Sequence, residues 1–200
     1  MYYIDTDKER EMNKTIYLIR HGESEVNKNK NKVIEDKGHH EMFTLYFWKS
    51  AFKYLTSSMD SKLTEKGRQQ AIKQGENLKS LNFIEKKNIE CIIHSPLKRT
   101  RDTCKLMFGE WTNIFFEEEK LLTEKYLSEY FYADIEERAE ILKGIIMSRK
   151  EKSMILVGHS RIFQALIGQQ VKIPNCSVWQ IELSDNGLFS NLTKLYDSIL

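Results

Sequence analysis

The sequence predicts an α/β fold, a three-layer α/β/α sandwich around a mostly parallel central sheet. Three short runs, at 16–19, 89–94 and 153–158, are rich in β-branched and aliphatic residues and are predicted to be buried strands. Segments with apolar residues at helical spacing lie between them, which is typical of crossover helices in a parallel sheet. Polar residues follow each run directly, at the strand ends where open α/β sheets bind ligands.

The first strand ends abruptly in Arg20-His21-Gly22. An imidazole can act as a covalent nucleophile, and a guanidinium offers phosphoryl oxygens a planar fork of permanent charge. Glycine lets backbone N–H groups come close to an anion. The three residues together suggest a phosphohistidine site. An isolated Arg-His-Gly is more often a solvated turn, so the decision depends on the residues downstream.

The composition predicts one domain, residues 1–200, with an aromatic-rich insertion at about 30–59. A chain of 200 residues with 40% hydrophobic residues can bury one sizeable core. The 31 basic and 29 acidic residues nearly cancel, so the net charge of +2 gives no reason to expect nucleic acid or a membrane surface as a partner. Any selectivity for anions must therefore be local.

The termini and the cysteines predict a cytoplasmic protein. The charged N-terminal segment holds no apolar core of signal-peptide length, so neither a secretion signal nor a membrane anchor is expected. No apolar run approaches the roughly 18 residues of a spanning helix. Cys91, Cys104 and Cys176 lack metal-type spacing and are expected to be buried, reduced thiols.

The insertion predicts an amphipathic helix, because aromatic and aliphatic residues between Met42 and Leu55 recur at spacings of three and four. This helix could pack on the core or form a wall over the site. His39-His40-Glu41 precedes it and superficially resembles a metal site. Adjacent histidines point apart on a regular element and no further ligand cluster follows, so no metal is expected.

Two helix starts follow the insertion. Thr64 before Glu65 is a suitable N-cap for a helix that docks on the sheet, and this helix is expected to be structural. Ser95 as N-cap and Pro96 as first helical residue predict a second start. From its first turn Arg99 would point back toward the end of the strand, and a helix N-terminus with an arginine suits an anion.

The rest of the chain completes the predicted sandwich. A short strand is expected at 114–116, helices at 135–147 and 162–170, and a β-hairpin of strands 177–183 and 188–195 joined by an Asp-Asn-Gly turn. Three strand ends thus carry His21 with Arg20, the segment from Ser95 to Arg99, and His159. Their convergence at one sheet edge is what a composite phosphate pocket requires.

Four motifs in order resemble those of the histidine phosphatase superfamily, which includes cofactor-dependent phosphoglycerate mutase and the bisphosphatase domain acting on fructose 2,6-bisphosphate. They are Arg-His-Gly-Glu at 20–23 with Asn27 at the expected offset, Leu-Thr-x-x-Gly-x-x-Gln-Ala at 63–71 with Gln70 as its glutamine, Ser-Pro-Leu-x-Arg at 95–99, and Val-Gly-His at 157–159. The resemblance implies a phosphoglycerate mutase-like fold.

The resemblance also implies a two-step phosphoryl transfer that needs no metal or cofactor. His21 would attack phosphorus while Arg20, Arg99, Asn27 and His159 hold the phosphoryl oxygens. Glu124 would be the general acid, since the family places a glutamate at this distance after the second arginine. The rival carboxylates are those of Glu117, Glu118, Glu119 and Glu129.

Departures from the family pattern bear on the reaction. Ser160 stands where many relatives have glycine, although its backbone N–H remains, and Arg161 either contacts phosphate or lies on the helix surface. The Gly-x-Trp-Glu-Gly signature is absent, and the stretch from Glu124 to His159 is too short for a mutase-type cap. A smaller cap lets water reach phosphohistidine, which favours hydrolysis.

The expected protein is therefore a metal-independent phosphomonoesterase acting on a small phosphorylated substrate or a phosphoprotein. A mutase stays open, because the aromatic insertion could also close the pocket. A catalytically weak binding or regulatory module is the alternative from another class, with the insertion as its partner surface. The retained histidines and arginines argue against it, and a homodimer is compatible with either interpretation.

Overall fold

The computed structural model describes residues 13–28, 60–111, 113–124 and 135–200. Within them, six strands form one sheet in the order β3-β2-β4-β1-β5-β6. The strands are β1 (Lys14–Arg20), β2 (Cys91–His94), β3 (Phe115–Glu118), β4 (Ser153–Gly158), β5 (Val178–Leu183) and β6 (Phe189–Tyr196). The strands from β3 to β1 pair in parallel, whereas β5 is antiparallel to both β1 and β6. The predicted mostly parallel sheet is confirmed.

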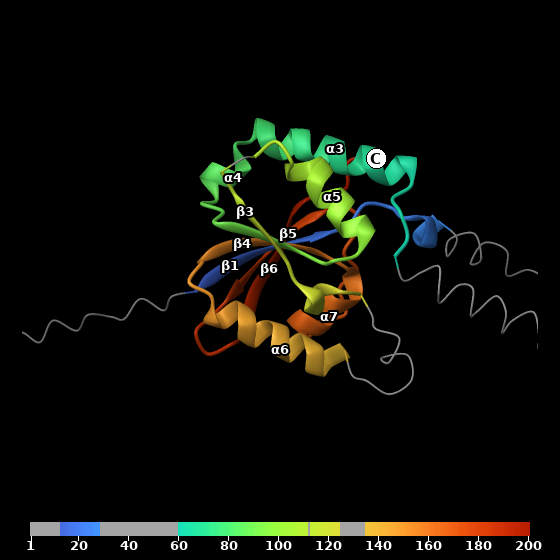
Figure 1. Ribbon diagram of the computed structural model, residues 1–200. Helices are drawn as coiled ribbons and strands as arrows, with labels where there is room; N and C mark the ends of the chain where they lie inside the picture. The colour runs from blue at the N-terminus through green and yellow to red at the C-terminus, as the bar shows by residue number, and fades with distance from the viewer. Residues whose placement is uncertain (1–12, 29–59, 112, 125–134) are drawn as a thin grey trace, which may run out of the picture.

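Helices cover both faces of the sheet. They are α3 (Glu65–Ser80), α4 (Phe83–Lys86), α5 (Lys98–Phe108), α6 (Ile135–Ser148) and α7 (Ser160–Ile167). In Figure 1, α3 and α5 lie on one side of the sheet and α6 and α7 on the other. The three layers are those expected from the sequence. The predicted insertion at 30–59 and its aromatic helix lie outside the described residues.

Alternate residues of the central strands supply two cores. In β1, Ile16 and Leu18 pack into the core beneath α6 and α7, whereas Tyr17 and Ile19 pack into the core beneath α3 and α5. All six residues of β4 are buried. Successive side chains of a strand point to opposite faces, so a strand covered on both sides needs a continuous apolar run. This requirement explains why the sequence pattern located these two strands.

The predicted start of α5 is wrong. The helix begins at Lys98, and Leu97 occupies the cap position with an extended backbone. Ser95 does not cap the helix; its Oγ accepts the Leu97 N–H at 3.3 Å and lies 3.0 Å from Nε2 of His159. Proline disfavours a helical conformation for the residue before it, and the Ser95 hydroxyl faces His159, which follows β4. The helix therefore starts two residues later than Pro96.

The loop after β1 packs backbone to backbone on the first turn of α3. A Cβ added to Gly22 would lie 2.4 Å from the carbonyl oxygen of Gly67, and one added to Gly67 would lie 2.0 Å from that of Glu23. Thr64 caps α3 through the Gly67 N–H at 3.0 Å and also donates to the Glu23 carboxylate at 2.9 Å. Helix α3, expected to be structural, thus also positions the loop that follows β1.

We expect Gly67→Ala to lower the free energy of unfolding by about 1–3 kcal/mol, because an added methyl group overlaps backbone atoms that have no side-chain freedom to move away. Urea unfolding measures the change. The matched control is Gly144→Ala on α6, where nothing lies within 4 Å of the added Cβ. Alanine there should stabilise the helix by about 0.5–1 kcal/mol. Equal stability of the Gly67→Ala variant and the wild type would contradict the close contact.

Candidate active site

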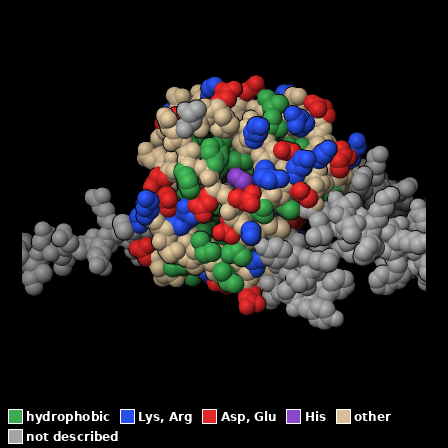
Figure 2. Space-filling model, viewed as in Figure 1, with side chains coloured by type: hydrophobic (Ala, Val, Ile, Leu, Met, Phe, Trp, Pro, Cys, Tyr) green, Lys and Arg blue, Asp and Glu red, His purple; other side chains and the backbone are tan. Residues whose placement is uncertain are grey.

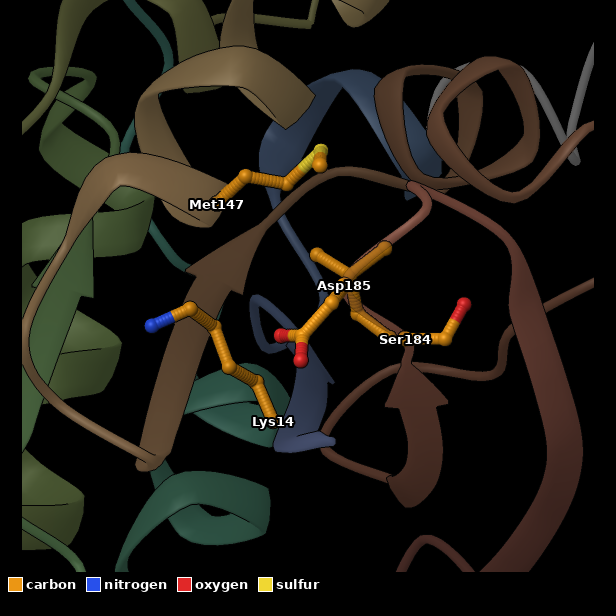
Figure 3. Close-up of a pocket in the computed structure, with 5 residues that line it drawn as sticks. Lys14, Met147, Ser184 and Asp185 are labelled. Atoms are coloured by element: carbon orange, nitrogen blue, oxygen red, sulfur yellow. The ribbon is translucent and has the colours of Figure 1, made fainter. Parts of the chain in front are cut away.

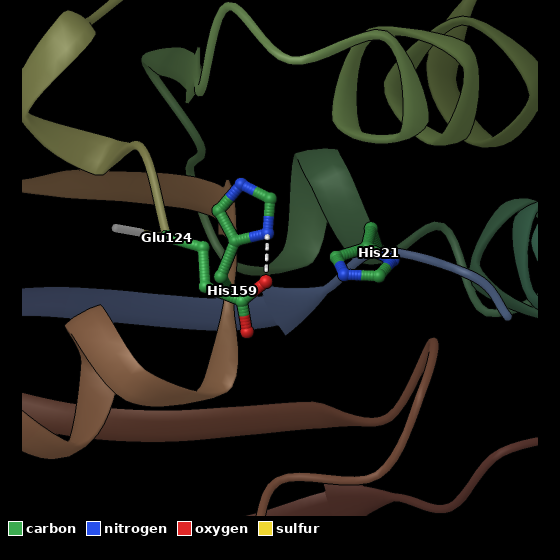
Figure 4. Close-up of side chains that lie close together, drawn as sticks. All are labelled: His21, Glu124 and His159. Atoms are coloured by element: carbon green, nitrogen blue, oxygen red, sulfur yellow. Dashed lines mark ion pairs between the residues drawn. The ribbon is translucent and has the colours of Figure 1, made fainter. Parts of the chain in front are cut away.

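The structure brings the predicted strand-end residues together. His21 follows β1 and is 1% exposed, and His159 follows β4 and is fully buried. Their ring centroids are 5.0 Å apart. Arg99 reaches them from the first turn of α5, and Glu124 reaches them from the segment after a short 3-10 turn (Lys120–Leu122). Four side chains that are distant in the sequence therefore share one buried centre, three of which appear in Figure 4.

The hydrogen bonds of His21 fix its tautomer. Nδ1 lies 2.6 Å from the carbonyl oxygen of Gly22, which can only accept, so Nδ1 carries the proton. Nε2 receives a hydrogen bond from Nε–H of Arg99 at 3.2 Å, so Nε2 carries the lone pair. Asn175 holds the backbone of His21 by donating to its carbonyl oxygen at 2.6 Å. The ring is thus oriented with its nucleophilic nitrogen toward the arginine.

Arg99 links His21 to the carboxylate of Glu124. Its side chain is nearly buried, and Nη2 donates to Oε2 of Glu124 at 2.9 Å while Nε donates to His21. Thr103, one turn further along α5, donates to the Arg99 carbonyl oxygen at 2.7 Å and accepts the Gly22 N–H at 3.0 Å. These contacts tie α5 to the loop after β1 and fix the guanidinium between an imidazole and a carboxylate.

Glu124 is the carboxylate that the geometry favours among the rivals named from the sequence. Its Oε2 lies 3.9 Å from Nδ1 of His159, as the dashed line in Figure 4 shows, and its side chain is 26% exposed. Glu117 instead forms a two-bond ion pair with Arg149 at 2.8 and 3.0 Å. Glu119 accepts the Leu121 N–H and so caps a turn, Glu118 is exposed, and Glu129 lies outside the described residues.

His159 is neutral in the folded protein. Burial lowers its pKa well below the usual 6.5, and the positive charges of Arg99, Arg20 and Arg138 act in the same direction together with His21. Its Nε2 contacts the Ser95 hydroxyl, whereas its buried Nδ1 has no hydrogen-bond partner among the described residues. A buried polar atom without a partner costs free energy, so this nitrogen marks the place where a ligand would lie.

The lowered pKa of His159 predicts acid sensitivity. Below about pH 6.5 the histidine binds a proton in the unfolded chain but not in the folded one. The free energy of unfolding should therefore decrease as the pH is lowered through this range. This group contributes at most about 1.4 kcal/mol per pH unit. Unfolding of the wild type and of His159→Gln at several pH values measures the difference. Equal losses in both proteins would show that His159 does not titrate in this way.

Arg20 supplies a second unpartnered donor. Its Nη1 donates to the carbonyl oxygen of Ile173 at 3.0 Å, while the buried Nε–H has no hydrogen-bond partner among the described residues. Burial lowers the pKa of this guanidinium, and Glu124 and Arg99 lie within electrostatic reach of it. The site therefore combines two guanidinium groups and a neutral imidazole, which is the donor set of an oxyanion pocket.

The remaining predicted contact residues follow β1 and β4, Asn27 in the segment after β1 and Ser160 next to His159. Oδ1 of Asn27 accepts from the N–H and the hydroxyl of Ser24 at 3.2 and 3.0 Å, so its amide nitrogen is the end that can donate to a ligand. Ser160 is half-buried and begins α7, whose first backbone N–H groups donate no intrahelical hydrogen bond and can therefore donate to an anion. Arg161 is exposed, so of the two alternatives for it the structure favours the helix surface.

Three supporting residues were not predicted. Thr103 and Asn175 act on the backbone of the loop after β1, and Arg138 contacts the backbone of the segment that carries Glu124. No local pattern marks them, because each contact joins distant parts of the chain. The alignment of Gln70 does agree with the structure: its Oε1 accepts the Glu23 N–H at 2.9 Å, whereas Gln69 is exposed.

The ligand atoms of His21, Glu124 and His159 lie within 4.8 Å of one another, which raises the question of a metal ion. Arg99 donates hydrogen bonds to two of these three residues, and Arg20 is close enough to perturb the charges in the site. A cation placed among them would meet both guanidinium charges at short range. The electrostatics of the residues present therefore suit an anion and not a metal ion.

The positive charge is local to the site. On the face seen in Figure 2, Lys and Arg side chains are interspersed with Asp and Glu. A separate hollow of about 40 Å³ lies at the start of β1, lined by Lys14, Met147, Leu183, Ser184 and Asp185 (Figure 3). It has room for about one water molecule, and the Lys14 ammonium contacts the carbonyl oxygens of Arg149 and Glu151. This hollow adds no ligand site.

All three cysteines are buried and free, as expected. Burial raises the pKa of the Cys91 thiol to about 11 and those of Cys104 and Cys176 to about 12. They therefore stay protonated at neutral pH and are poor nucleophiles. Within the described residues, no helix combines the length and the apolar character that a membrane crossing requires.

The fold and the site define a phosphoglycerate mutase-like α/β protein with a histidine-centred anion pocket. The family model of the histidine phosphatase superfamily (branch 1) matches residues 48–142, a range that includes Arg99 and Glu124. Over this range, just under half of the chain, the sequence is similar to the histidine phosphatase superfamily, in agreement with the resemblance of its motifs. A search of curated proteins finds no match.

Solved structures share the fold over nearly the whole chain. A putative alpha-ribazole-5'-P phosphatase from Escherichia coli is 14% identical with a TM-score of 0.58, covering 92% of this chain and 96% of its own. The protein histidine phosphatase SixA, complexed with tungstate, is 14% identical with a TM-score of 0.58, and the match covers 91% of this chain and 96% of SixA. Phosphoglycerate mutase from Bacillus anthracis is 17% identical with a TM-score of 0.59, and the match covers 94% of this chain and 93% of the mutase.

Proposed function

We propose that this protein is a metal-independent phosphomonoesterase that works through a phosphohistidine on His21. The observation that carries the proposal is the fixed tautomer of His21, with Nδ1–H bonded to a carbonyl and the Nε2 lone pair turned toward Arg99. A nucleophile held in this way, next to a carboxylate and two arginines, has the groups that phosphoryl transfer requires.

In the first step Nε2 of His21 forms a bond to phosphorus as the bond between phosphorus and the ester oxygen breaks. Arg99, Arg20 and the amide of Asn27 donate to the phosphoryl oxygens, and the arrival of these oxygens draws the Arg99 N–H away from Nε2. The arriving phosphoryl oxygens replace Glu124 as the partner of Arg99, so Glu124 takes up a proton from solvent and gives it to the leaving oxygen. The products of this step are a free alcohol, a phosphorylated imidazole and the Glu124 carboxylate.

In the second step the Glu124 carboxylate takes a proton from water while the water oxygen bonds to phosphorus. The bond between phosphorus and Nε2 breaks, and His21 returns to the neutral tautomer in which it began. Inorganic phosphate leaves, and Glu124 is again protonated. After the initial uptake of a proton from solvent, each proton has a donor and an acceptor within the site, so the cycle needs no further reactant.

The relatives support phosphoryl chemistry without selecting a substrate. The structurally similar proteins include a putative alpha-ribazole-5'-P phosphatase, the protein histidine phosphatase SixA and a phosphoglycerate mutase. We propose a small phosphorylated metabolite or a phosphoprotein as substrate. The phosphohistidine intermediate is common to hydrolysis and to mutase transfer, and the two differ in whether water or a second alcohol accepts the phosphoryl group.

The test is release of p-nitrophenol from p-nitrophenyl phosphate in the presence of EDTA, with quenching in alkali to trap a phosphohistidine on the protein. Turnover that survives the chelator, with a trapped phosphoryl group on His21, is the expected result. Activity that appears only when a divalent metal is added would overturn the proposal. Transfer from a phosphoglycerate without release of phosphate would instead favour a mutase.

A further inference from the structure

We infer that Arg138 is a positioning residue for Glu124: its guanidinium holds the backbone that carries the candidate general acid. This inference rests on the proposed function, since it gives Glu124 the role of proton donor. Arg138 lies in the first turn of α6, on the face of the sheet opposite to α5. It belongs to none of the motifs that carry the family resemblance.

Arg138 is a buried cation, with 6% of its surface exposed. Burying a guanidinium is unfavourable unless its N–H groups find acceptors. Nη1 donates to the carbonyl oxygens of Leu121 and Thr123, and Nη2 lies 3.4 Å from that of Glu124. Three acceptors within four consecutive residues are thus gathered by one side chain.

The segment that Arg138 holds is also anchored in the core by side chains of its own. Leu122 is fully buried among the residues beneath α6 and α7, and Thr123 is 7% exposed. Beyond them Glu124 extends toward Arg99 and His159 with a side chain that is 26% exposed. Arg99 contacts the carboxylate of Glu124 and Arg138 contacts its backbone. The two arginines therefore fix opposite ends of the same residue.

Proton transfer to a leaving oxygen depends on this placement, because a displacement of about 1 Å can cost on the order of 100-fold in rate. Lysine at position 138 would keep the charge, but its single nitrogen cannot reproduce the planar fork that spans three carbonyls. Methionine would keep the length and lose all the donors. We expect both changes to weaken proton donation while leaving His21 in place.

The experiment compares two substrates that differ in their need for a proton. p-Nitrophenolate leaves readily without one, whereas phenolate is a strong base whose conjugate acid has a pKa of about 10. For Arg138→Met we expect kcat/KM to fall about 10- to 100-fold on phenyl phosphate and by less than about 3-fold on p-nitrophenyl phosphate. Arg138→Lys should lie between the wild type and Arg138→Met, and it serves alone if the methionine variant does not fold.

The matched control is Arg149→Met. Arg149 is a partly buried arginine that follows the C-terminal end of α6 and pairs with Glu117 and Glu151. Its loss should affect stability and leave the ratio of the two substrates unchanged. Equal losses on both substrates in the Arg138 variants would indicate a merely structural role and overturn the inference, as would the same change of ratio in Arg149→Met.

Glu124→Gln separates this inference from the proposed function. If Glu124 is the proton donor, this variant shows the same selective loss on phenyl phosphate, and adding Arg138→Met to it causes no further change of ratio. A wild type without turnover, or a Glu124→Gln variant without selective loss, would mean that the proposed function fails. A selective loss in Glu124→Gln with none in the Arg138 variants would mean that only the inference about Arg138 fails.

Discussion

Replacing His21 by alanine is expected to abolish phosphatase activity, with kcat lowered on the order of 10⁴-fold or more, as for other enzymes that lose their nucleophile. The reason is that Nε2 of His21, which accepts the hydrogen bond from Arg99, would form the covalent bond to phosphorus in the proposed mechanism. Hydrolysis of p-nitrophenyl phosphate in EDTA measures the loss. The phosphoryl group trapped in alkali should vanish in the same variant.

His94→Ala is the matched control for this prediction. His94 is half-buried at the end of β2, and its Nδ1 lies 3.0 Å from the Ser95 carbonyl oxygen. Because it has no role in the proposed transfer, its loss should leave kcat within about 3-fold of the wild type. Retention of a tenth or more of the activity by folded His21→Ala would exclude the phosphohistidine route. A wild type without phosphatase activity would favour a mutase of narrow specificity or a binding role over the proposed phosphatase.

Replacing Arg99 by alanine is expected to lower kcat/KM by about 100- to 1,000-fold, the range for a removed transition-state hydrogen-bond donor. The loss has two parts, since Arg99 contacts both His21 and Glu124 in the resting protein and would contact phosphate during transfer. Lysine should recover little, because one ammonium cannot present two donors in the directions that the planar fork serves.

Arg101→Ala provides the comparison on the same helix. Arg101 lies two residues after Arg99 on α5 and is exposed. Its removal changes the net charge by the same amount, so any general electrostatic effect on a phosphorylated substrate should appear in both variants. We expect Arg101→Ala to stay within about 2-fold of the wild type, because exposed charges are screened. Similar losses of kcat/KM in both variants would show that Arg99 acts only through its charge at long range and not through specific hydrogen bonds.

The sequence located the fold well because its central strands are buried on both faces. The runs in β1 and β4 are continuous and apolar, and such runs bounded by polar residues have few alternatives. The start of α5 was placed wrongly because capping rules describe a helix in isolation. The hydroxyl of Ser95 faces His159, a residue 64 positions away, and no local rule includes that partner.

Site residues that belong to local sequence motifs could be predicted, and those outside such motifs could not. His21, Arg99 and His159 each follow or begin a regular element, so the pattern of strand ends brought them to one edge. The position of Glu124 came from the resemblance to a family and not from any periodicity. Asn175 and Arg138 left no signal, since one contacts a residue 154 positions away and the other uses backbone carbonyls that every residue has.

The hydrogen bond from Arg99 to Nε2 of His21 occupies the lone pair of the candidate nucleophile. The Nε2 lone pair that would attack phosphorus accepts a hydrogen bond from Arg99, so it is not available to an uncharged electrophile that enters the pocket. Only a molecule that offers the guanidinium better acceptors can release that nitrogen, and a phosphate dianion does so with several oxygens at once. In the proposed mechanism, selectivity for oxyanions would therefore begin when the substrate's phosphate frees Nε2 of His21, before any other part of the substrate is recognised.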